Sequence, residues 1–187
     1  MDDSAPKRAD ARRNQKALLD AAAAVFVASG VEAPIRDIAT KAGVGTATIY
    51  RHFPTRADLI VAVYRHQVEA LAEAGPELLA SSATPYRALA QWLDQFVDFV
   101  ITKQGLPAVL QSDDPCYDPL HDYFLERLVP VCTQLLDAAA AEIHDDLDAY
   151  ELMRGIGGLC AGASRKHRYD ARRLVGFLVA GLRRPGV

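Results

Sequence analysis

The sequence lacks any apolar run approaching the roughly 18 residues that a membrane-spanning helix requires. Its longest apolar stretch runs from Ala21 to Ala28 and is mostly alanine. The chain opens with MDDSAPKRAD, a polar segment that carries acids and is not the pattern of a signal peptide. These absences predict a cytoplasmic protein with no membrane partner, long enough at 187 residues to bury a real core.

Cysteine is scarce and follows no pattern. The three cysteines, Cys116, Cys132 and Cys160, are widely separated and form no CxxC pair. An odd number without pattern predicts small buried thiols in a reducing compartment rather than a disulfide framework. The acidic segment around Cys116 and His121 matches no zinc-ligand spacing, so we expect no metal site.

The groupings on which catalysis depends are also missing. The sequence shows no nucleophile paired with a general base and no glycine-rich loop of the kind that cradles phosphate. Four of its histidines stand isolated on expected helices or loops: His66, His121, His144 and His167. We therefore predict that the protein is not an enzyme and needs no cofactor.

What the sequence does contain is charge sorted along its length. Residues 1–56 carry a net +3, residues 57–151 a net −13 and residues 152–187 a net +7, within a total of −3. A basic N-terminal region ahead of an acidic body suits a protein that presents one end to a polyanion. The alternative is that the charges only follow solvated faces. We expect Arg172 and Arg173, with other C-terminal cations, to cover the last loop and the start of the last helix.

The most informative stretch is IATKAGVGTATIYRHF, residues 38–53. Gly43 can take a positive φ and end a first short helix, and Thr46 is placed to cap a second one. Ile49 and Phe53 are spaced to face inward. The outer face then holds side chains that suit the major groove of DNA, which are Thr46, Ala47, Thr48, Tyr50, Arg51 and His52. This pattern predicts a helix-turn-helix with residues 46–52 as the recognition helix, although Tyr50 could instead be a core aromatic.

Helices are expected on both sides of this motif. Residues 1–9 look disordered, and a helix from about Ala11 ends at Gly30. Arg12 and Arg13 oppose the dipole of that helix, which a nearby phosphate backbone would explain. Pro34 is expected as the first residue of the next helix. Beyond the motif, a capping box at residues 55–58 opens a long helix that we expect to break at residues 75–76.

Three segments, LLDAAAAVFVASG, IRDIATKAGVGTATIYRHF and PTRADLIVAVY, follow one another as in the tetracycline-repressor (TetR) family. The chain resembles the DNA-binding domain of that family over about residues 11–65. The resemblance implies contacts to bases and phosphates from Thr46, Thr48, Tyr50 and His52. It also places Arg12 before the first helix and Arg56 near the phosphate backbone. Two positions depart from the family: residues 34–35 replace a frequent hydroxyl pair, and Gly45 replaces a frequent serine.

The second half is helical by its apolar spacing. We expect helices from Pro85 to about residue 105, from Pro119 to about Ile143 with a kink near Pro130, from Leu147 to about Ala163, and from Tyr169 to Leu182. Residues 112–119 form a loop in this scheme. The predicted fold is all-α: a three-helix DNA-binding head with a helix-turn-helix, residues 1–55, joined to a helical-bundle ligand-binding and dimerisation domain, residues 56–187.

The TetR resemblance implies that this body binds a small molecule and forms a homodimer through its last two helices. The glycines and alanines of residues 155–163 would allow close helix approach, or would belong to a glycine-tolerant core helix. The ligand-site candidates are apolar and aromatic residues with two polar side chains among them: Trp92, Phe96, Phe99, Cys116, Tyr117, His121, Phe124 and Met153. Such a stripe can equally be ordinary core.

The function predicted from the sequence is a homodimeric transcriptional repressor. Two recognition helices about 34 Å apart would bind a palindromic operator, and a small-molecule effector would release it by a population shift. A DNA-binding helical protein without an effector is the first alternative, and a helical enzyme is the second.

Overall fold

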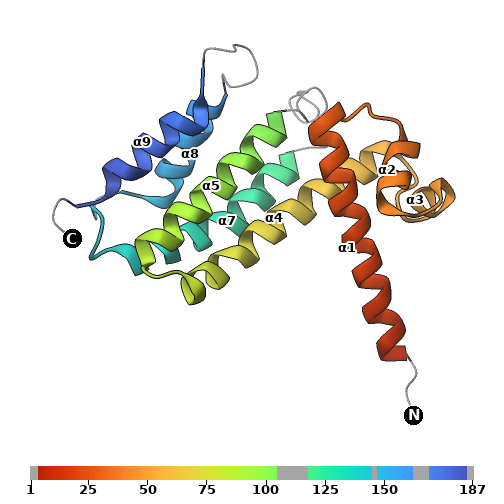
Figure 1. Cartoon of the computed structure of the whole chain (residues 1–187), viewed down its shortest axis with the longest axis horizontal. Coiled ribbons are helices and arrows are strands. Elements are labelled where there is room, and N and C mark those ends of the chain that lie inside the picture. The colour runs from red at the N-terminus through yellow and green to blue at the C-terminus, as the bar shows by residue number, and fades with distance from the viewer. Residues whose placement is uncertain (1–3, 105–117, 145–146, 162–168, 185–187) are drawn as a thin grey trace. The chain divides into compact units, whose positions relative to one another are not determined.

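The computed structural model describes residues 4–104, 118–144, 147–161 and 169–184 (Figure 1). Within these ranges the chain forms eight helices: α1 (Ser4–Ser29), α2 (Ile35–Ala42), α3 (Thr46–His52), α4 (Arg56–Ser81), α5 (Pro85–Gln104), α7 (Asp118–Ala139), α8 (Ala149–Cys160) and α9 (Ala171–Leu182). The predicted all-α class is confirmed. No helix of the described residues is both long and apolar enough to cross a membrane.

The chain divides into two compact units, Met1–Gln67 and Val68–Val187. The division falls inside α4, which contributes residues to both units. The sequence placed the domain boundary earlier, between residues 55 and 56, and that boundary stays a prediction. Each unit has its own buried apolar residues, as a domain requires.

The first unit is built from α1, α2, α3 and the first part of α4. Gly30 at φ 77° ends α1, and its N–H donates to the Phe26 carbonyl at 2.9 Å. Gly43 at φ 68° ends α2 in the left-handed conformation that glycine adopts without steric cost. The buried side chains of the unit come from all four helices, and include Leu18, Phe26, Ile38, Ile49, Leu59 and Val63. Both predicted glycine helix ends are confirmed.

Three helix starts differ from the sequence expectation. Helix α1 begins at Ser4, so the expected disorder of residues 1–9 is wrong from that residue onward. Gly45, rather than Thr46, is the N-cap of α3, because its backbone is extended (φ −75°, ψ 148°) while Thr46 is already helical. Pro34 is likewise the N-cap of α2 rather than its first residue, with φ −59° and ψ 136°.

The expected break of α4 at residues 75–76 is also wrong, because the helix continues through Pro76 to Ser81. Tertiary packing holds this segment. A Cβ added at Gly75 would collide with the Val131 side chain of α7, so the two helices touch at the glycine. The buried indole of Trp92 donates its N–H to the Leu71 carbonyl at 2.8 Å, five residues before the proline. Contacts to α5 and α7 therefore outweigh the local cost of Pro76.

The second unit packs α5 against α7, with α8 and α9 adjoining α5. Asp148 caps α8 by accepting from the N–H groups of Tyr150 and Glu151, at 2.8 and 3.1 Å. Asp170 caps α9 by accepting from the Arg173 N–H at 3.0 Å. These caps explain why α8 and α9 begin two residues later than expected.

Two further boundaries of the second unit differ from the sequence expectation or lie outside the described residues. Helix α7 ends at Ala139, short of the expected Ile143, and a bridge pairs Ile143 with Arg183. Residues 112–117 of the expected loop lie outside the described residues, and residues 118–119 belong to α7, so the expectation is wrong at these two positions.

Candidate nucleic-acid interface

Helix α3 has one buried face and one exposed face. Ile49 and Phe53 are only 1% and 6% exposed, whereas Tyr50 is 51% exposed. Thr46, Ala47, Arg51 and His52 are also exposed, and Thr48 is half-buried. The alternative that Tyr50 is a core aromatic is therefore wrong. The helix offers hydroxyl, methyl, phenol and guanidinium groups outward, which are groups that contact bases and phosphates.

The turn between α2 and α3 is fixed by backbone bonds. The Val44 N–H donates to the Ala39 carbonyl at 3.0 Å, and the Thr48 N–H donates to the Gly45 carbonyl at 3.0 Å. Val44 is half-buried, as expected for the apolar residue of this turn. Because Gly43 supplies the positive φ, α3 can leave the turn in a new direction. The result is a helix-turn-helix.

The start of α4 carries the capping box expected from the sequence. The Thr55 N–H and hydroxyl donate to Asp58 Oδ2 at 2.9 and 2.7 Å, and the Asp58 N–H donates to Thr55 Oγ1 at 3.1 Å. Each residue satisfies a backbone donor at the helix end that would otherwise lack a partner. This cap fixes where α4 begins, with three residues between it and the end of α3.

Arg56, the residue after Thr55, points its guanidinium toward its own unit. Its guanidinium donates from Nη1 to the Val31 carbonyl, and from both Nη1 and Nη2 to the Ala33 carbonyl at 3.0 Å. These carbonyls belong to the loop between α1 and α2. The family resemblance implied a place for Arg56 near the phosphate backbone, and the structure adds this internal role.

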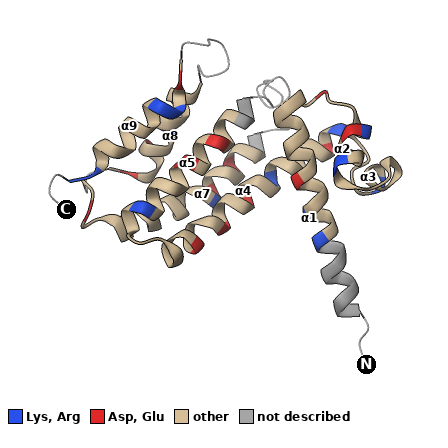
Figure 2. Ribbon diagram, viewed as in Figure 1, with Lys and Arg blue, Asp and Glu red and all other residues tan. Residues whose placement is uncertain are grey.

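The other expected DNA contacts lie on α1. Arg13 is exposed there, as is the nearby Lys16, while the side chain of Arg12 lies outside the described residues. Lys and Arg are also present on α2 and α3, so Figure 2 shows several basic positions in the first unit. Cations spread over these three helices suit contacts with a polyanion.

The expected ligand residues of α5 and α7 form a stacked cluster. Ring centroids lie 5.7 Å apart for Trp92–Phe96, 6.1 Å for Phe96–Phe124 and 5.8 Å for Phe99–Phe124. His121 stacks on Phe124 at 6.1 Å from an exposed position. The structure therefore brings five of the eight candidates together as buried packing with one exposed end.

The remaining ligand candidates are not part of this stack. Met153 is buried on α8, and Cys116 and Tyr117 lie outside the described residues. Among the described residues, no group of three or more His, Cys, Asp or Glu is placed to hold a metal ion.

A groove that the sequence did not reveal lies between α5 and α9. It has a volume of about 280 Å³, and residues of only these two helices line it: Tyr86, Ala90, Asp94, Val97, Arg172, Val175, Gly176, Val179 and Ala180. The Tyr86 hydroxyl donates to the Val179 carbonyl at 3.2 Å. None of the expected ligand residues lines this groove. The spacing by threes and fours of residues 86, 90, 94 and 97 was the available signal.

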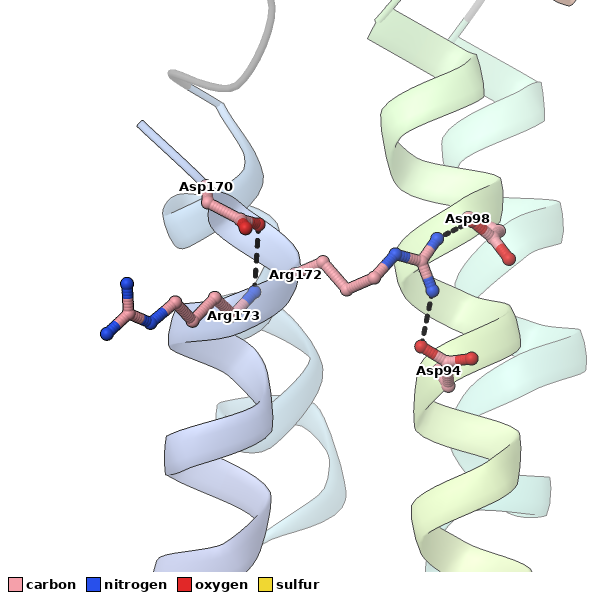
Figure 3. A network of polar contacts seen from close by, with 5 residues as sticks. All are labelled: Asp94, Asp98, Asp170, Arg172 and Arg173. Carbon is pink, nitrogen blue, oxygen red and sulfur yellow. Dashed lines mark hydrogen bonds and ion pairs between the residues drawn. The ribbon is translucent and has the colours of Figure 1, made fainter. Parts of the chain in front are cut away.

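Arg172 joins the same two helices, as Figure 3 shows. Its two terminal nitrogens each reach one carboxylate, Asp94 and Asp98, which are four residues apart on α5. Asp170 caps α9 beside it, and the Arg173 guanidinium lies 5.5 Å from the Phe177 ring centroid. Arg172 thus lies at the partly exposed start of α9, as expected, and in addition pairs with two carboxylates of α5.

Helices α8 and α9 expose apolar side chains. On α9, Phe177 is 62% exposed, and Leu174 and Leu178 are 39% and 38% exposed. On α8, Tyr150 is 43% exposed, and a Cβ added at Gly155, Gly157 or Gly158 would meet no atom within 4 Å. Four of the six large apolar side chains that are exposed among the described residues thus lie on α8 and α9.

Comparison with known proteins gives two matching family models. Residues 18–63 match the model described as bacterial regulatory proteins, tetR family. Residues 84–184, more than half of the chain, match the model described as the C-terminal domain of SbtR-like transcriptional regulators. The first match covers the helix-turn-helix and the second covers most of the helical body.

A solved structure supports both matches. The TetR transcriptional regulator SCO0520 from Streptomyces coelicolor is 36% identical, with a TM-score of 0.77 over 92% of this chain and 99% of that one. Its similarity therefore extends through both units.

Two curated relatives from Mycolicibacterium smegmatis match over shorter segments. The transcriptional activator FasR is 33% identical over 106 residues, which span 56% of this chain and 48% of FasR. The transcriptional repressor LfrR is 46% identical over 54 residues, which span 29% of this chain and 28% of LfrR. These matches thus cover less than half of either relative.

Proposed function

Because the chain belongs to the TetR family of bacterial regulatory proteins, we propose that it is a homodimeric repressor that a small-molecule effector releases from a palindromic operator. The observation that carries the proposal is the exposed outer face of α3, with Tyr50 and Arg51 turned away from the core. In this role the protein works in the cytoplasm, where it meets DNA, and catalyses no reaction.

The outer face of α3 is the proposed recognition surface. Thr46, Thr48 and Tyr50 reach base edges and phosphates in the major groove, and Arg51 adds positive charge and His52 an imidazole at the end of the helix. Arg12 and Arg13 of α1 contact the phosphate backbone. Affinity for the operator should therefore fall steeply with salt.

The exposed apolar surface of α8 and α9 supports a homodimer. A two-fold axis beside these helices would bring Leu174, Phe177 and Leu178 of one protomer against the same surface of its partner. The open glycines of α8 would let the helices approach closely. Such a dimer presents two α3 helices to an operator whose half-sites repeat after one turn of DNA.

The relative LfrR supports a small-molecule effector, for which the second unit is the proposed binding domain. LfrR is named a repressor, and its solved structure holds proflavine. That structure is 24% identical to this chain, with a TM-score of 0.60. Coupling between effector and operator in such systems is typically about 1–3 kcal/mol, which weakens DNA binding by roughly 5- to 150-fold.

FasR favours a second candidate, activation of transcription, because it is named an activator and matches more of this chain than LfrR does. The same DNA-binding surface and dimer serve both roles. The two candidates differ only in the sign of the effect on a promoter.

The test begins with selection of binding sites from random DNA. We expect the selected sites to share an inverted repeat and to bind two protomers, as measured by sedimentation. A reporter placed behind such a site should be silenced when the protein is expressed. Sites without dyad symmetry would contradict the dimeric mode, and increased reporter output would favour activation. If the protein retains no DNA even in dilute buffer, the proposed function is wrong.

A further inference from the structure

Arg56 makes three hydrogen bonds within its own unit. Nη1 donates to the carbonyls of Val31 and Ala33, and Nη2 donates to the Ala33 carbonyl at 3.0 Å. The acceptors are more than twenty residues away in sequence, in the loop that joins α1 to α2. The first residue of α4 is therefore tied to the loop that leads into the helix-turn-helix.

That loop has little else in its own sequence to fix the start of α2. Its N-cap, Pro34, makes no side-chain cap bond and has no N–H. The loop turns at Gly30, where the Ala33 N–H donates to the Gly30 carbonyl at 3.1 Å. Val31 and Ala33 are 7% and 3% exposed, so carbonyls in this region need a protein donor rather than bulk water.

The chemistry of the bonds requires arginine. A planar guanidinium presents a rigid fork of N–H donors, and here both Nη atoms of the fork meet the Ala33 carbonyl. Lysine would keep the charge but would offer a single nitrogen on a flexible stem. Arginine and lysine can therefore make the same point-charge contact to phosphate, but only arginine can make these bonds to the loop.

We propose that Arg56 is a positioning residue for DNA binding, which holds the α1–α2 loop against the start of α4 instead of contacting phosphate. The loop fixes the start of α2, and α2 packs on α3. The hydrogen bonds from Arg56 to the loop therefore help to fix the position of the recognition helix. The inference rests on DNA binding through α3, as in the proposed function. It assigns Arg56 a role that acts through its neighbours.

The test compares Arg56→Met and Arg56→Lys with Arg51→Met, an exposed arginine of α3, as the matched control. Two quantities are measured. One is amide hydrogen exchange in the free protein at Ala33 and at Asp37, whose N–H donates to the Pro34 carbonyl at 3.0 Å. The other is the salt dependence of binding to the operator selected from random DNA.

For Arg56→Met we expect the exchange rate at both amides to rise about tenfold and operator affinity to fall about tenfold. The slope of log affinity against log salt concentration should not change. Arg56→Lys should behave similarly. Arg51→Met should lower the slope by about 0.9 per protomer and leave exchange unchanged.

The proposal would be overturned by unchanged exchange, or by a slope that falls by about 0.9 per protomer in Arg56→Met with Arg56→Lys close to the original protein. If Arg56→Met does not fold, the same two measurements on Arg56→Lys decide. If Arg51→Met leaves DNA binding unchanged, the assignment of α3 as the recognition helix is wrong. The exchange result still decides whether Arg56 holds the loop.

Discussion

Arg127 of α7 and Glu69 of α4 form a two-point ion pair in the second unit. Arg127 Nε lies 2.8 Å from Glu69 Oε1, and Nη2 lies 2.5 Å from Oε2. The Tyr123 hydroxyl donates to the same carboxylate. The hydrogen bond from Arg127 has the largest effect and the bond from Tyr123 adds to it, so the pKa of Glu69 lies below its ordinary value. No local pattern predicts this pair, because its partners are 58 residues apart.

The ion pair predicts a pH-dependent effect of Glu69→Gln. Since the folded protein lowers the pKa of Glu69, the contribution of the pair is complete above the ordinary value of 4.5 and is lost as pH falls through the lower folded value. We expect Glu69→Gln to lower the urea midpoint at neutral pH and to approach the original protein in acid. Glu73→Gln, an exposed acid on the same helix, is the control. A difference that persists in acid would contradict the linkage.

The exposed face of α3 predicts the effect of Tyr50→Ala combined with Arg51→Ala. Contacts to base edges are worth about 1–3 kcal/mol each, so specific operator affinity should fall by about 100-fold or more. Because both side chains are exposed, helix content should not change. A gel shift measures the affinity, and Arg87→Ala, at an exposed position of α5, is the control. Unchanged affinity would show that α3 is not the recognition helix.

The open glycines of α8 predict that Gly158→Leu breaks the dimer without harming the protomer. A Cβ at Gly158 meets no atom within 4 Å, so the protomer has room for the side chain. A partner subunit packed against α8 leaves no room for this side chain. We expect sedimentation to give a monomer and circular dichroism to stay unchanged, while Ala138→Leu at an exposed position of α7 leaves the dimer intact. A dimeric Gly158→Leu protein would place the interface elsewhere.

The contact between Gly75 and Val131 predicts a destabilising Gly75→Ala substitution. In an exposed helix, alanine is more favourable than glycine by about 1 kcal/mol. Here the added Cβ collides with the Val131 side chain, and overpacking of this kind costs about 1–3 kcal/mol. Urea unfolding should show that Val131→Ala rescues Gly75→Ala, so that the double variant is more stable than the sum of the single effects. Additive losses would argue against the contact.

Burial predicts that Cys132 is unreactive in the folded protein. Burial, with a smaller effect of Asp148, raises the pKa of the Cys132 thiol to about 12. Mass spectrometry should find it unmodified by iodoacetamide at mildly alkaline pH until urea unfolds the chain. Because the folded pKa exceeds the ordinary 9.0, this thiol should lower stability as pH rises above 9.0. Rapid labelling without urea would contradict its burial.

The elements that local sequence could predict are those set by neighbouring residues. Gly30 and Gly43 end helices because glycine tolerates their positive φ, and Thr55 and Asp58 cap α4 across three residues. Ile49 and Phe53 share the buried face of α3 because of helical spacing. These short-range rules were enough to place the helix-turn-helix.

The features that the sequence could not predict depend on contacts between distant segments. Helix α4 continues through Pro76 because α5 and α7 pack against it. Trp92 and Phe96 form part of a buried stack rather than lining the α5–α9 groove, a choice that helical spacing alone leaves open. Arg172 and Arg56 are charged residues whose partners come from other helices or loops, so composition gave no indication of their bonds.

The burial of Trp92 decides what an optical measurement on this protein can report. It is the only tryptophan of the chain, and it lies in the second unit with its indole N–H on the Leu71 carbonyl. Its emission therefore follows the melting of the helical body alone. Such a curve would not detect unfolding of the helices of the first unit, for which the tyrosines at positions 50 and 64 are the native chromophores.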